Sequence, residues 1–300
     1  MVYSVEGKVR YLADDNPETK PKKVVPGMKL SEEGTIIIRE DGKVGIYFDE
    51  LMGTVAKNGR HAVTAILDDP DLLEETDLAA IFGKNLEKAA HPYYAGVKVS
   101  RAGFAAAGGP KKPPPPPPPP NNKGRHGHGD KAYKIIRVSP VGGKVSGDTL
   151  SFRWRLRDSV KVSNKLTLTV QSKEGEIMGT VPAKKIARTV PAKRFKLSEG
   201  STYQWFVSST EVDSIRSGPV EFQYVSHDEV NAIMLDLSNE KAYQSSTASA
   251  KLLMEASLLE LKGFYMEAYD RLRTAIKTDK KNKLARNLHK AYLFKHDIVK

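Results

Sequence analysis

Residues 150–157 read Leu-Ser-Phe-Arg-Trp-Arg-Leu-Arg, and this stretch decides the fold of the central part of the chain. Apolar side chains occupy every second position, and serine or arginine stands between them. Because successive side chains of a β-strand point to opposite faces, the alternation predicts a strand with one apolar and one basic face. The basic row consists of Arg153, Arg155 and Arg157, with Lys161 close behind, and it is a candidate surface for an anionic partner. The alternative is a solvated strand face.

Short runs with the same period-two pattern recur on both sides of this strand. Seven strand candidates share the pattern, at 133–139, 150–157, 165–172, 176–181, 194–197, 202–208 and 219–225. About seven short antiparallel strands within roughly 95 residues are typical of an immunoglobulin-like sandwich. We therefore expect a seven-stranded immunoglobulin-like sandwich over residues 132–227.

A proline run marks the clearest boundary in the chain. Eight consecutive prolines occupy residues 113–120, and a Gly-, His- and Lys-rich stretch follows them. Because proline fixes φ and lacks an amide donor, the run predicts a semi-rigid polyproline II spacer about 25 Å long. We place it in a linker at 110–131. His126 and His128 lie in this linker and would hold a divalent metal only loosely, so a solvated linker is the simpler interpretation and no cofactor is expected.

The N-terminal segment, residues 1–109, predicts a small β-rich module with one helix. The pair Asp41-Gly42 stands between two apolar runs and predicts a hairpin turn. A strand-like piece at 93–100 would close the module. The other strand-like runs alternate apolar and polar residues and lie at 7–12, 35–39 and 44–48.

Helical periodicity appears in two parts of the sequence. In 71–90, leucine, isoleucine and phenylalanine recur at helical spacing, with acidic residues early and lysines late, as the helix dipole favours. From residue 228 to 300 the pattern is helical throughout, which predicts an all-α C-terminal segment. Its helices are expected at 230–237, 248–261, 265–277 and 283–296. The complete chain is thus expected to be multi-domain and mainly β, with an all-α helical-repeat C-terminal segment.

With their pattern of glycines and alternating apolar residues, residues 5–60 resemble the FecR-like domain of bacterial envelope proteins. The resemblance implies an envelope location, and a FecR-like extracytoplasmic signalling regulator is one function that it suggests. The family's sigma-factor-binding region and membrane helix have no counterpart in this sequence, which disfavours a classical iron-signalling regulator. The matching features are Val5-x-Gly7-x-Val9, Gly27-x-x-Leu30, Ile36–Ile38, Asp41-Gly42 and Val44-x-Ile46-x-Phe48.

The central segment resembles bacterial fibronectin-type-III-like or immunoglobulin-like domains. The resemblance rests on Ser139-Pro140-x-Gly142-Gly143, on Phe152-x-Trp154, and on a leucine, a glycine turn and Tyr203-x-Trp205 late in the segment. The last group is similar to the tyrosine corner of such sandwiches. Modules of this kind mostly space, adhere or bind glycans. Trp154 and Trp205 would stack on a sugar ring if exposed, but burial in the core is the simpler interpretation.

Residues 249–282 resemble one tetratricopeptide repeat. Ala256, Ala268 and Ala275 provide the small residues that let two helices pack closely, and Gly263 falls at the turn between the helices. The family's closing proline is replaced by Lys280. Such repeats bind proteins, so the resemblance implies a protein partner on the C-terminal helices. The candidate contact residues are Leu252, Leu259, Tyr265 and Tyr269.

Composition excludes several classes of function. The chain has no cysteine, which excludes disulfides, thiolate metal sites and thiol nucleophiles. No apolar run is long enough to span a membrane, and the first residues lack a signal peptide's basic start and apolar middle. From this we expect either a cytoplasmic protein or a mature exported chain. No P-loop, dinucleotide fingerprint, nucleophile elbow or His-Glu-x-x-His motif occurs, so we expect no enzyme.

The net charge of +12 is unevenly distributed. Residues 1–110 hold 14 Lys and Arg against 17 Asp and Glu, residues 111–228 hold 21 against 10, and residues 229–300 hold 13 against 9. The basic excess therefore belongs mainly to the middle segment. A basic face attracts nucleic acid, anionic envelope polymers or acidic proteins, and the alternative is a solvated surface. Among these partners we expect an anionic envelope polymer or peptidoglycan and do not expect nucleic acid. We expect a non-enzymatic binding or scaffolding protein of the periplasm or cell envelope. The alternatives are a peptidoglycan- or glycan-binding envelope protein and a FecR-like regulator.

Overall fold

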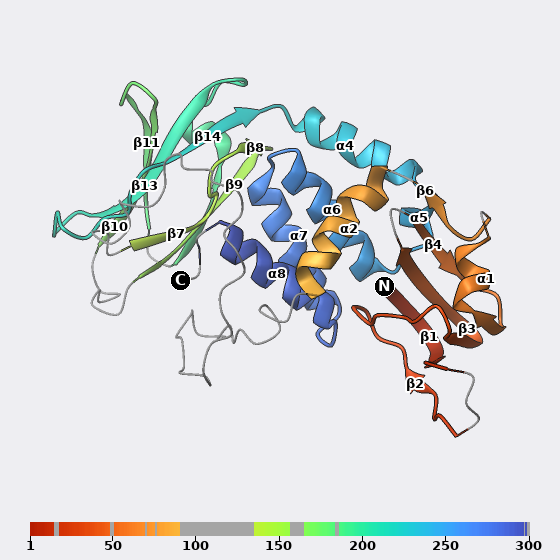
Figure 1. The fold of residues 1–300 in the computed structure, drawn as a ribbon. Helices are drawn as coiled ribbons and strands as arrows, with labels where there is room; N and C mark the ends of the chain where they lie inside the picture. The colour runs from red at the N-terminus through yellow and green to blue at the C-terminus, as the bar shows by residue number, and fades with distance from the viewer. Residues whose placement is uncertain are drawn as a thin grey trace, which may run out of the picture. The chain divides into compact units, whose positions relative to one another are not determined.

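The computed structural model describes residues 1–14, 18–48, 51–69, 71–75, 77–90, 135–156, 165–183, 186–296 and 298 (Figure 1). Strands dominate the N-terminal and central parts, and helices form the C-terminal part. This confirms the expected change from mainly β to all-α structure along a multi-domain chain. Several predicted features lie outside the described residues: the strand at 93–100, the proline run, His126, His128, Arg157 and Lys161.

The chain forms two compact units, and it enters each of them more than once. The first unit combines the N-terminal strands and helices with Asn231–Lys262 and Glu267–Tyr292. The second combines the central strands, up to Val230, with Gly263–Met266 and the residues from Leu293 onward. The sequence predicts four consecutive segments instead, and their boundaries stay a prediction.

The first unit is built on one sheet with the strand order β2-β1-β3-β4-β6, and β5 also pairs with β3. Its core consists of apolar side chains from these strands, among them Ile36, Ile38, Val44 and Ile46, each at most 1% exposed. The strands are β1 (Val2–Leu12), β2 (Lys22–Lys23), β3 (Thr35–Phe48), β4 (Leu51–Val55), β5 (Gly59–Ala62) and β6 (Glu74–Glu75).

The predicted hairpin at Asp41-Gly42 is wrong. β3 continues through these residues and pairs with β1 on both sides of them, with Glu6 opposite Lys43 and Lys8 opposite Arg39. The extra residues of β3 form an irregularity in the ladder, where Glu40 and Asp41 have φ of 38° and 46°. The positive φ values thus fall on Glu40 and Asp41 and not on Gly42, and the pairing with the long partner β1 continues past them, so the segment forms a bulge and not a two-residue turn.

Among the described N-terminal residues, the helices are α1 (Val63–Leu67) and α2 (Asp77–Ala90). α2 begins later than the predicted helix at 71–90 because Glu74 and Glu75 form β6 and pair with β4. Phe82 of α2 is fully buried and meets the ring of Tyr3 edge-on, with centroids 6.0 Å apart.

The C-terminal helices are α4 (His227–Asn239), α5 (Lys241–Gln244), α6 (Ala248–Leu261), α7 (Tyr265–Thr278) and α8 (Lys283–Lys295). Three of the predicted helices match α6, α7 and α8 to within one residue. α6 packs against α2 and β1, so the helices share the first unit with the N-terminal sheet. Thr247 caps α6 by accepting a 3.3 Å hydrogen bond from the Ala250 amide, and Asn282 caps α8 by accepting one of 3.1 Å from the Ala285 amide.

The second unit contains two sheets with a common core. One has the strand order β11-β10-β13-β14-β8 and the other β12-β9-β7, and β8 runs parallel to β14. Phe152 from one sheet and Trp205 from the other meet in this core, with ring centroids 5.2 Å apart. The strands are β7 (Ile135–Ser139), β8 (Lys144–Ser146), β9 (Thr149–Leu156), β10 (Leu166–Ser172), β11 (Ile177–Pro182), β12 (Ala187–Pro191), β13 (Thr202–Ser209) and β14 (Val220–Val225).

The predicted strand at 194–197 is wrong. Ala192–Phe195 is a turn of 3₁₀ helix, and Lys196 after it is left-handed, with φ of 48°. The strand of this region is β12 instead, which pairs with β9 and ends at Pro191. Phe195 is fully buried and lies edge-on to Phe152 at 5.9 Å, so its apolar character reflects an anchor in the core and not a strand face.

Polar contacts fix one corner of the second unit. The hydroxyl of Tyr203, at the start of β13, accepts a 2.8 Å hydrogen bond from the Ser198 amide five residues upstream. The Trp205 indole donates a 3.0 Å hydrogen bond to the Pro140 carbonyl. Among the described residues, no helix has the length and apolar character needed to cross a membrane.

Candidate binding surfaces

The predicted basic row on β9 is only half accessible. Arg153 and Arg155 lie on the middle strand of the three-stranded sheet, where Arg153 stands opposite Ala187 and Arg155 opposite Ile136. Both side chains are half-buried, and the Nε atom of each is shielded from solvent. Of the four residues predicted for this row, the structure describes these two.

The two tryptophans belong to the core of the second unit, as the simpler interpretation expected. Trp154 is 2% exposed and Trp205 is fully buried. Neither indole ring presents a face on which a sugar could stack. The row on β9 therefore gains no aromatic platform from its neighbour Trp154.

The four predicted contact residues on the helices divide into two pairs. Leu252 and Tyr265 are half-buried. Leu259 is fully buried and Tyr269 is 6% exposed, because both pack inside the helical assembly. Tyr269 lies against the rings of His289 and Tyr292, at 5.5 and 5.7 Å. The apolar spacing of Leu259 and Tyr269 thus serves helix packing, and the partner-contact role expected for them stays a prediction.

The C-terminal helices divide sharply by charge. Residues 229–270 contain three Lys and Arg and seven Asp and Glu, whereas residues 271–290 contain eight Lys and Arg and a single acidic residue, Asp279. A count over the whole segment hides this contrast. The basic half corresponds to the end of α7, the turn after it and most of α8.

Five exposed cations cluster around this turn, and we call them the α7–α8 basic surface. They are Lys277, Lys280, Lys281, Lys283 and Arg286. Lys283 and Arg286 stand three residues apart on α8 and thus share one face of the helix. Within the described part of the chain, none of the five forms an ion pair with a carboxylate.

Local hydrogen bonds organise the α7–α8 basic surface. The guanidinium of Arg286 donates to the carbonyls of Lys280 and Lys281, at 3.3 and 3.4 Å. Arg286 is thereby held at the turn beside two lysines. Asp279 accepts a 2.9 Å hydrogen bond from the Lys281 amide, so one oxygen of the single carboxylate is used by the turn itself.

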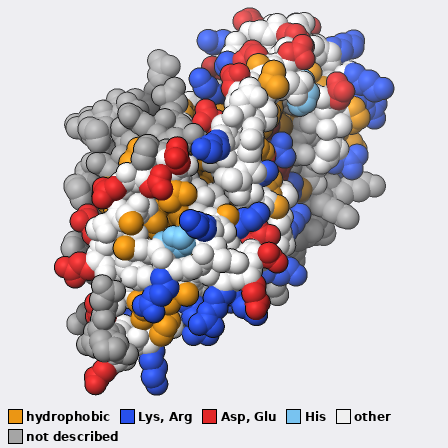
Figure 2. Space-filling view, turned by 90° about the vertical axis from the view of Figure 1, so that its right-hand side faces the viewer, with side chains coloured by type: hydrophobic (Ala, Val, Ile, Leu, Met, Phe, Trp, Pro, Cys, Tyr) orange, Lys and Arg blue, Asp and Glu red, His pale blue; other side chains and the backbone are white. Residues whose placement is uncertain are grey.

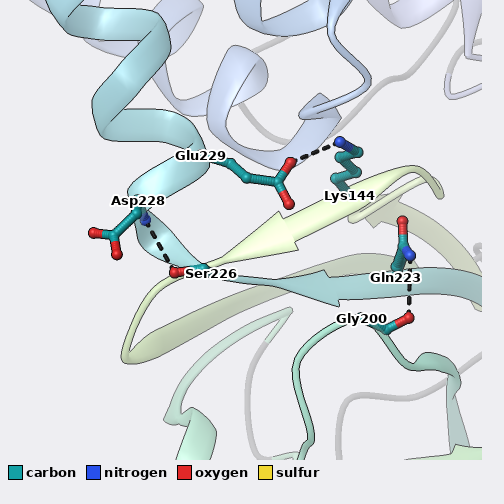
Figure 3. A network of polar contacts seen from close by, with 6 residues as sticks. All are labelled: Lys144, Gly200, Gln223, Ser226, Asp228 and Glu229. Atoms are coloured by element: carbon teal, nitrogen blue, oxygen red, sulfur yellow. Dashed lines mark hydrogen bonds and ion pairs between the residues drawn. The ribbon is translucent and has the colours of Figure 1, made fainter.

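Two lysines elsewhere in the chain are paired with carboxylates. Figure 3 shows Lys144 of β8 in a 2.7 Å ion pair with Glu229 in the first turn of α4, beside a hydrogen bond from the Asp228 amide to Ser226. Lys165 pairs with Glu211 at 3.5 Å. Figure 2 likewise shows a face on which positive and negative side chains are interspersed. The α7–α8 basic surface lacks such compensation.

Two pKa values report the electrostatic environment of α8. Burial, and then the charge of Arg286, lower the pKa of Lys290. Burial, and then the charge of Arg273, lower the pKa of His289 to about 4. The His289 Nε2 is shielded from solvent and has no hydrogen-bond partner among the described residues. In both groups, burial and the positive charge of a nearby arginine disfavour the protonated form.

A polar cluster supports the same helices from inside. Glu255 of α6 is 8% exposed; it accepts a 2.7 Å hydrogen bond from the Tyr243 hydroxyl and forms a 2.8 Å ion pair with Arg271 of α7. Burial and this carboxylate raise the pKa of Tyr243 to about 12. Arg271 is therefore compensated, and we do not count it in the α7–α8 basic surface.

A cavity of about 70 Å³ lies in the first unit between β4, residues 71–73 and α5. Two contacts border it: Ser245 donates to the Thr54 hydroxyl at 2.9 Å, and Lys241 donates to the Asp71 carbonyl at 3.4 Å. This volume suits about two water molecules and is far below the size of a site for a metabolite. The described residues also contain no group of three or more His, Asp and Glu side chains arranged to hold a metal ion.

Comparison with known proteins gives no further constraint. No family model matches the chain. No curated protein matches it either.

Proposed function

We propose that the chain is a non-enzymatic binding and scaffolding protein of the bacterial cell envelope, and that its C-terminal helices carry the main partner surface. The observation that carries the proposal is the α7–α8 basic surface, with five exposed cations and no compensating ion pair among the described residues. Uncompensated like charges repel one another, and a binding partner of opposite charge relieves that repulsion.

The geometry of the second unit supports an immunoglobulin-like module in this scaffold. Two sheets share one core, and Tyr203 reaches back to the Ser198 amide as in a tyrosine corner. The envelope location rests on the FecR-like resemblance of the N-terminal residues. A protein spacer or adhesion module is the role that such a sandwich most often has.

The helical part supports a tetratricopeptide-like repeat. Ala256, Ala268 and Ala275 are each at most 2% exposed, and Gly263 stands between α6 and α7 with φ of 87°. These are the places where the repeat requires close helix packing and a tight turn. A protein partner on the helices is the function that this repeat implies. The charge of the α7–α8 basic surface favours a second candidate, an anionic envelope polymer.

The test uses the full chain, because α6 packs against α2 and β1 and a truncation would remove part of a folded unit. We would immobilise the wild type, the variant Lys280→Glu/Lys281→Glu and the control Lys22→Glu/Lys23→Glu. The control also reverses two adjacent exposed lysines of the first unit, on β2. Material captured from an envelope extract is identified by mass spectrometry and glycan analysis. The proposal expects one component that the wild type and the control retain and the first variant loses. Identical capture by all three proteins would refute it.

A further inference from the structure

We propose that the α7–α8 basic surface binds a linear, non-nucleic phosphate polymer, such as a poly(phosphodiester) chain of the envelope. The inference rests on the proposed binding role and names the partner class for one part of the helical surface. Four properties of the surface favour this ligand: its charge density, its lack of apolar contact area, its shape and its lack of stacking groups.

The α7–α8 basic surface has a high density of positive charge. Five cations fall within ten residues, 277–286, and three of them, Lys280, Lys281 and Arg286, are gathered at one turn by the hydrogen bonds of Arg286. Neutralising them requires a ligand whose negative charges are closely spaced. A phosphate polymer carries one charge on every repeat and meets this requirement.

The described residues of this surface offer little apolar contact area. Protein interfaces derive most of their affinity from buried aromatic and aliphatic anchors. Among the described residues of α7, α8 and their turn, no large apolar side chain is more than about a third exposed, and Leu272, Leu284 and Leu288 are buried. A folded protein partner would find charge on this surface but no anchor. This disfavours it relative to a polyanion.

The cations of the surface follow a curved path. The cations continue from the last turn of α7, at Lys277, around Lys280 and Lys281, and onto one face of α8 at Lys283 and Arg286. Such a path bends around a helix end. A flexible chain can follow it, whereas the plane of a bilayer would meet only part of it.

The aromatic residues near the surface distinguish a nucleic acid from a non-nucleic phosphate polymer. Proteins that bind single-stranded nucleic acid combine basic grooves with aromatic rings on which the bases stack. The tyrosines near this surface, Tyr269 and Tyr292, are 6% and 3% exposed and pack with His289 in the interior. The described residues of the surface therefore offer charge for a phosphate backbone, and these two buried tyrosine rings give no platform for a base.

The binding test measures the fluorescence anisotropy of an end-labelled inorganic polyphosphate chain titrated with the full-length protein at several salt concentrations. For five phosphate contacts, log K should fall with log salt with a slope of about −3.5. Lys280→Glu/Lys281→Glu should weaken binding by about tenfold or more and make the slope shallower by about 1.4. Lys22→Glu/Lys23→Glu should bind like the wild type. Circular dichroism and thermal melting establish that both variants remain folded.

Two further probes decide between ligand classes. Single-stranded DNA with the same number of phosphates should bind no more tightly than polyphosphate, and tenfold tighter binding of DNA would overturn the assignment to a non-nucleic polymer. Binding to phosphatidylglycerol vesicles without binding to polyphosphate would overturn it in favour of a membrane surface. If polyphosphate fails while capture from envelope extract still depends on Lys280 and Lys281, this inference fails and the proposed binding role stands. If capture is also independent of these lysines, both fail.

Discussion

The basic row on β9 and the α7–α8 basic surface contain similar side chains in very different settings. Arg153 and Arg155 lie on the middle strand of a sheet, half-buried, with shielded Nε atoms. The cations around the α7–α8 turn are exposed, and Asp279, the single acidic residue of the sequence 271–290, hydrogen-bonds its own turn. A cation on a middle strand shares its face with residues of two neighbouring strands, whereas a helix end projects its side chains outward. Local surroundings, more than the count of charges, decide which region can receive a partner.

Acid should affect the helical region most strongly, and this is the largest effect that we expect. The His289 ring lies 5.5 Å from that of Tyr269, and burial, followed by the charge of Arg273, lowers its pKa to about 4 from an ordinary 6.5. Because the unfolded chain binds this proton more readily, the stabilising contribution is complete above pH 6.5 and is lost as the pH falls toward 4. The loss should approach about 3 kcal/mol. Urea unfolding followed at several pH values measures it.

The matched variant for this experiment is His289→Phe, which keeps a ring against Tyr269 and removes the titration. Its free energy of unfolding should depend less on pH than that of the wild type, with the difference confined to the window from pH 6.5 to 4. Parallel curves for the two proteins would show that His289 does not carry the effect.

Charge reversal on β9 should have the second-largest effect. Arg153→Glu removes a half-buried arginine from the middle strand of the sheet, and it places a shorter, negatively charged side chain there instead. We expect a loss of about 1–2 kcal/mol in the free energy of unfolding. Chemical denaturation of the full chain measures it. A change below about 0.5 kcal/mol, the usual range for surface substitutions, would mean that β9 and the α7–α8 turn do not differ in the way we infer.

Much of the fold can be predicted from the sequence where one pattern dominates. Period-two alternation located β9, β10, β13 and β14, and helical spacing located α6, α7 and α8, because in these elements one face is consistently buried. The failures occur where tertiary contacts choose between local options. The long partner β1 converts Asp41-Gly42 from a turn to a bulge, and the core anchor Phe195 makes its segment look like a strand. β8, with three residues paired parallel to β14, is too short to leave a periodic signal.

The candidate site was harder to predict for a related reason. The acidic residues of 229–270 cancel the basic residues of 271–290 in any count over the whole helical segment. A shorter window would have revealed the contrast. It would not have shown that Arg271 is paired with Glu255 while Lys280 and Lys281 are exposed, because ion pairing depends on which helices face each other. Apolar spacing also selected Leu259 and Tyr269, which the packing of the helices buries.

The smallest effect that we expect is a gain of stability when a lysine of the α7–α8 basic surface is replaced by glutamate. Lys281→Glu removes one member of the α7–α8 basic surface and places a negative charge beside the N-terminus of α8, where the helix dipole favours it. Both changes reduce repulsion with Lys280, Lys283 and Arg286, so the free energy of unfolding should rise by about 0.3–0.5 kcal/mol at low salt. The gain should disappear near 1 M salt, where the screening length is about 3 Å. Lys23→Glu, on the edge strand β2, is the control and should change stability little. If the variant protein is more stable and binds its ligand less tightly, the positive charges of this surface serve binding and not folding. A destabilised Lys281→Glu protein would contradict this interpretation.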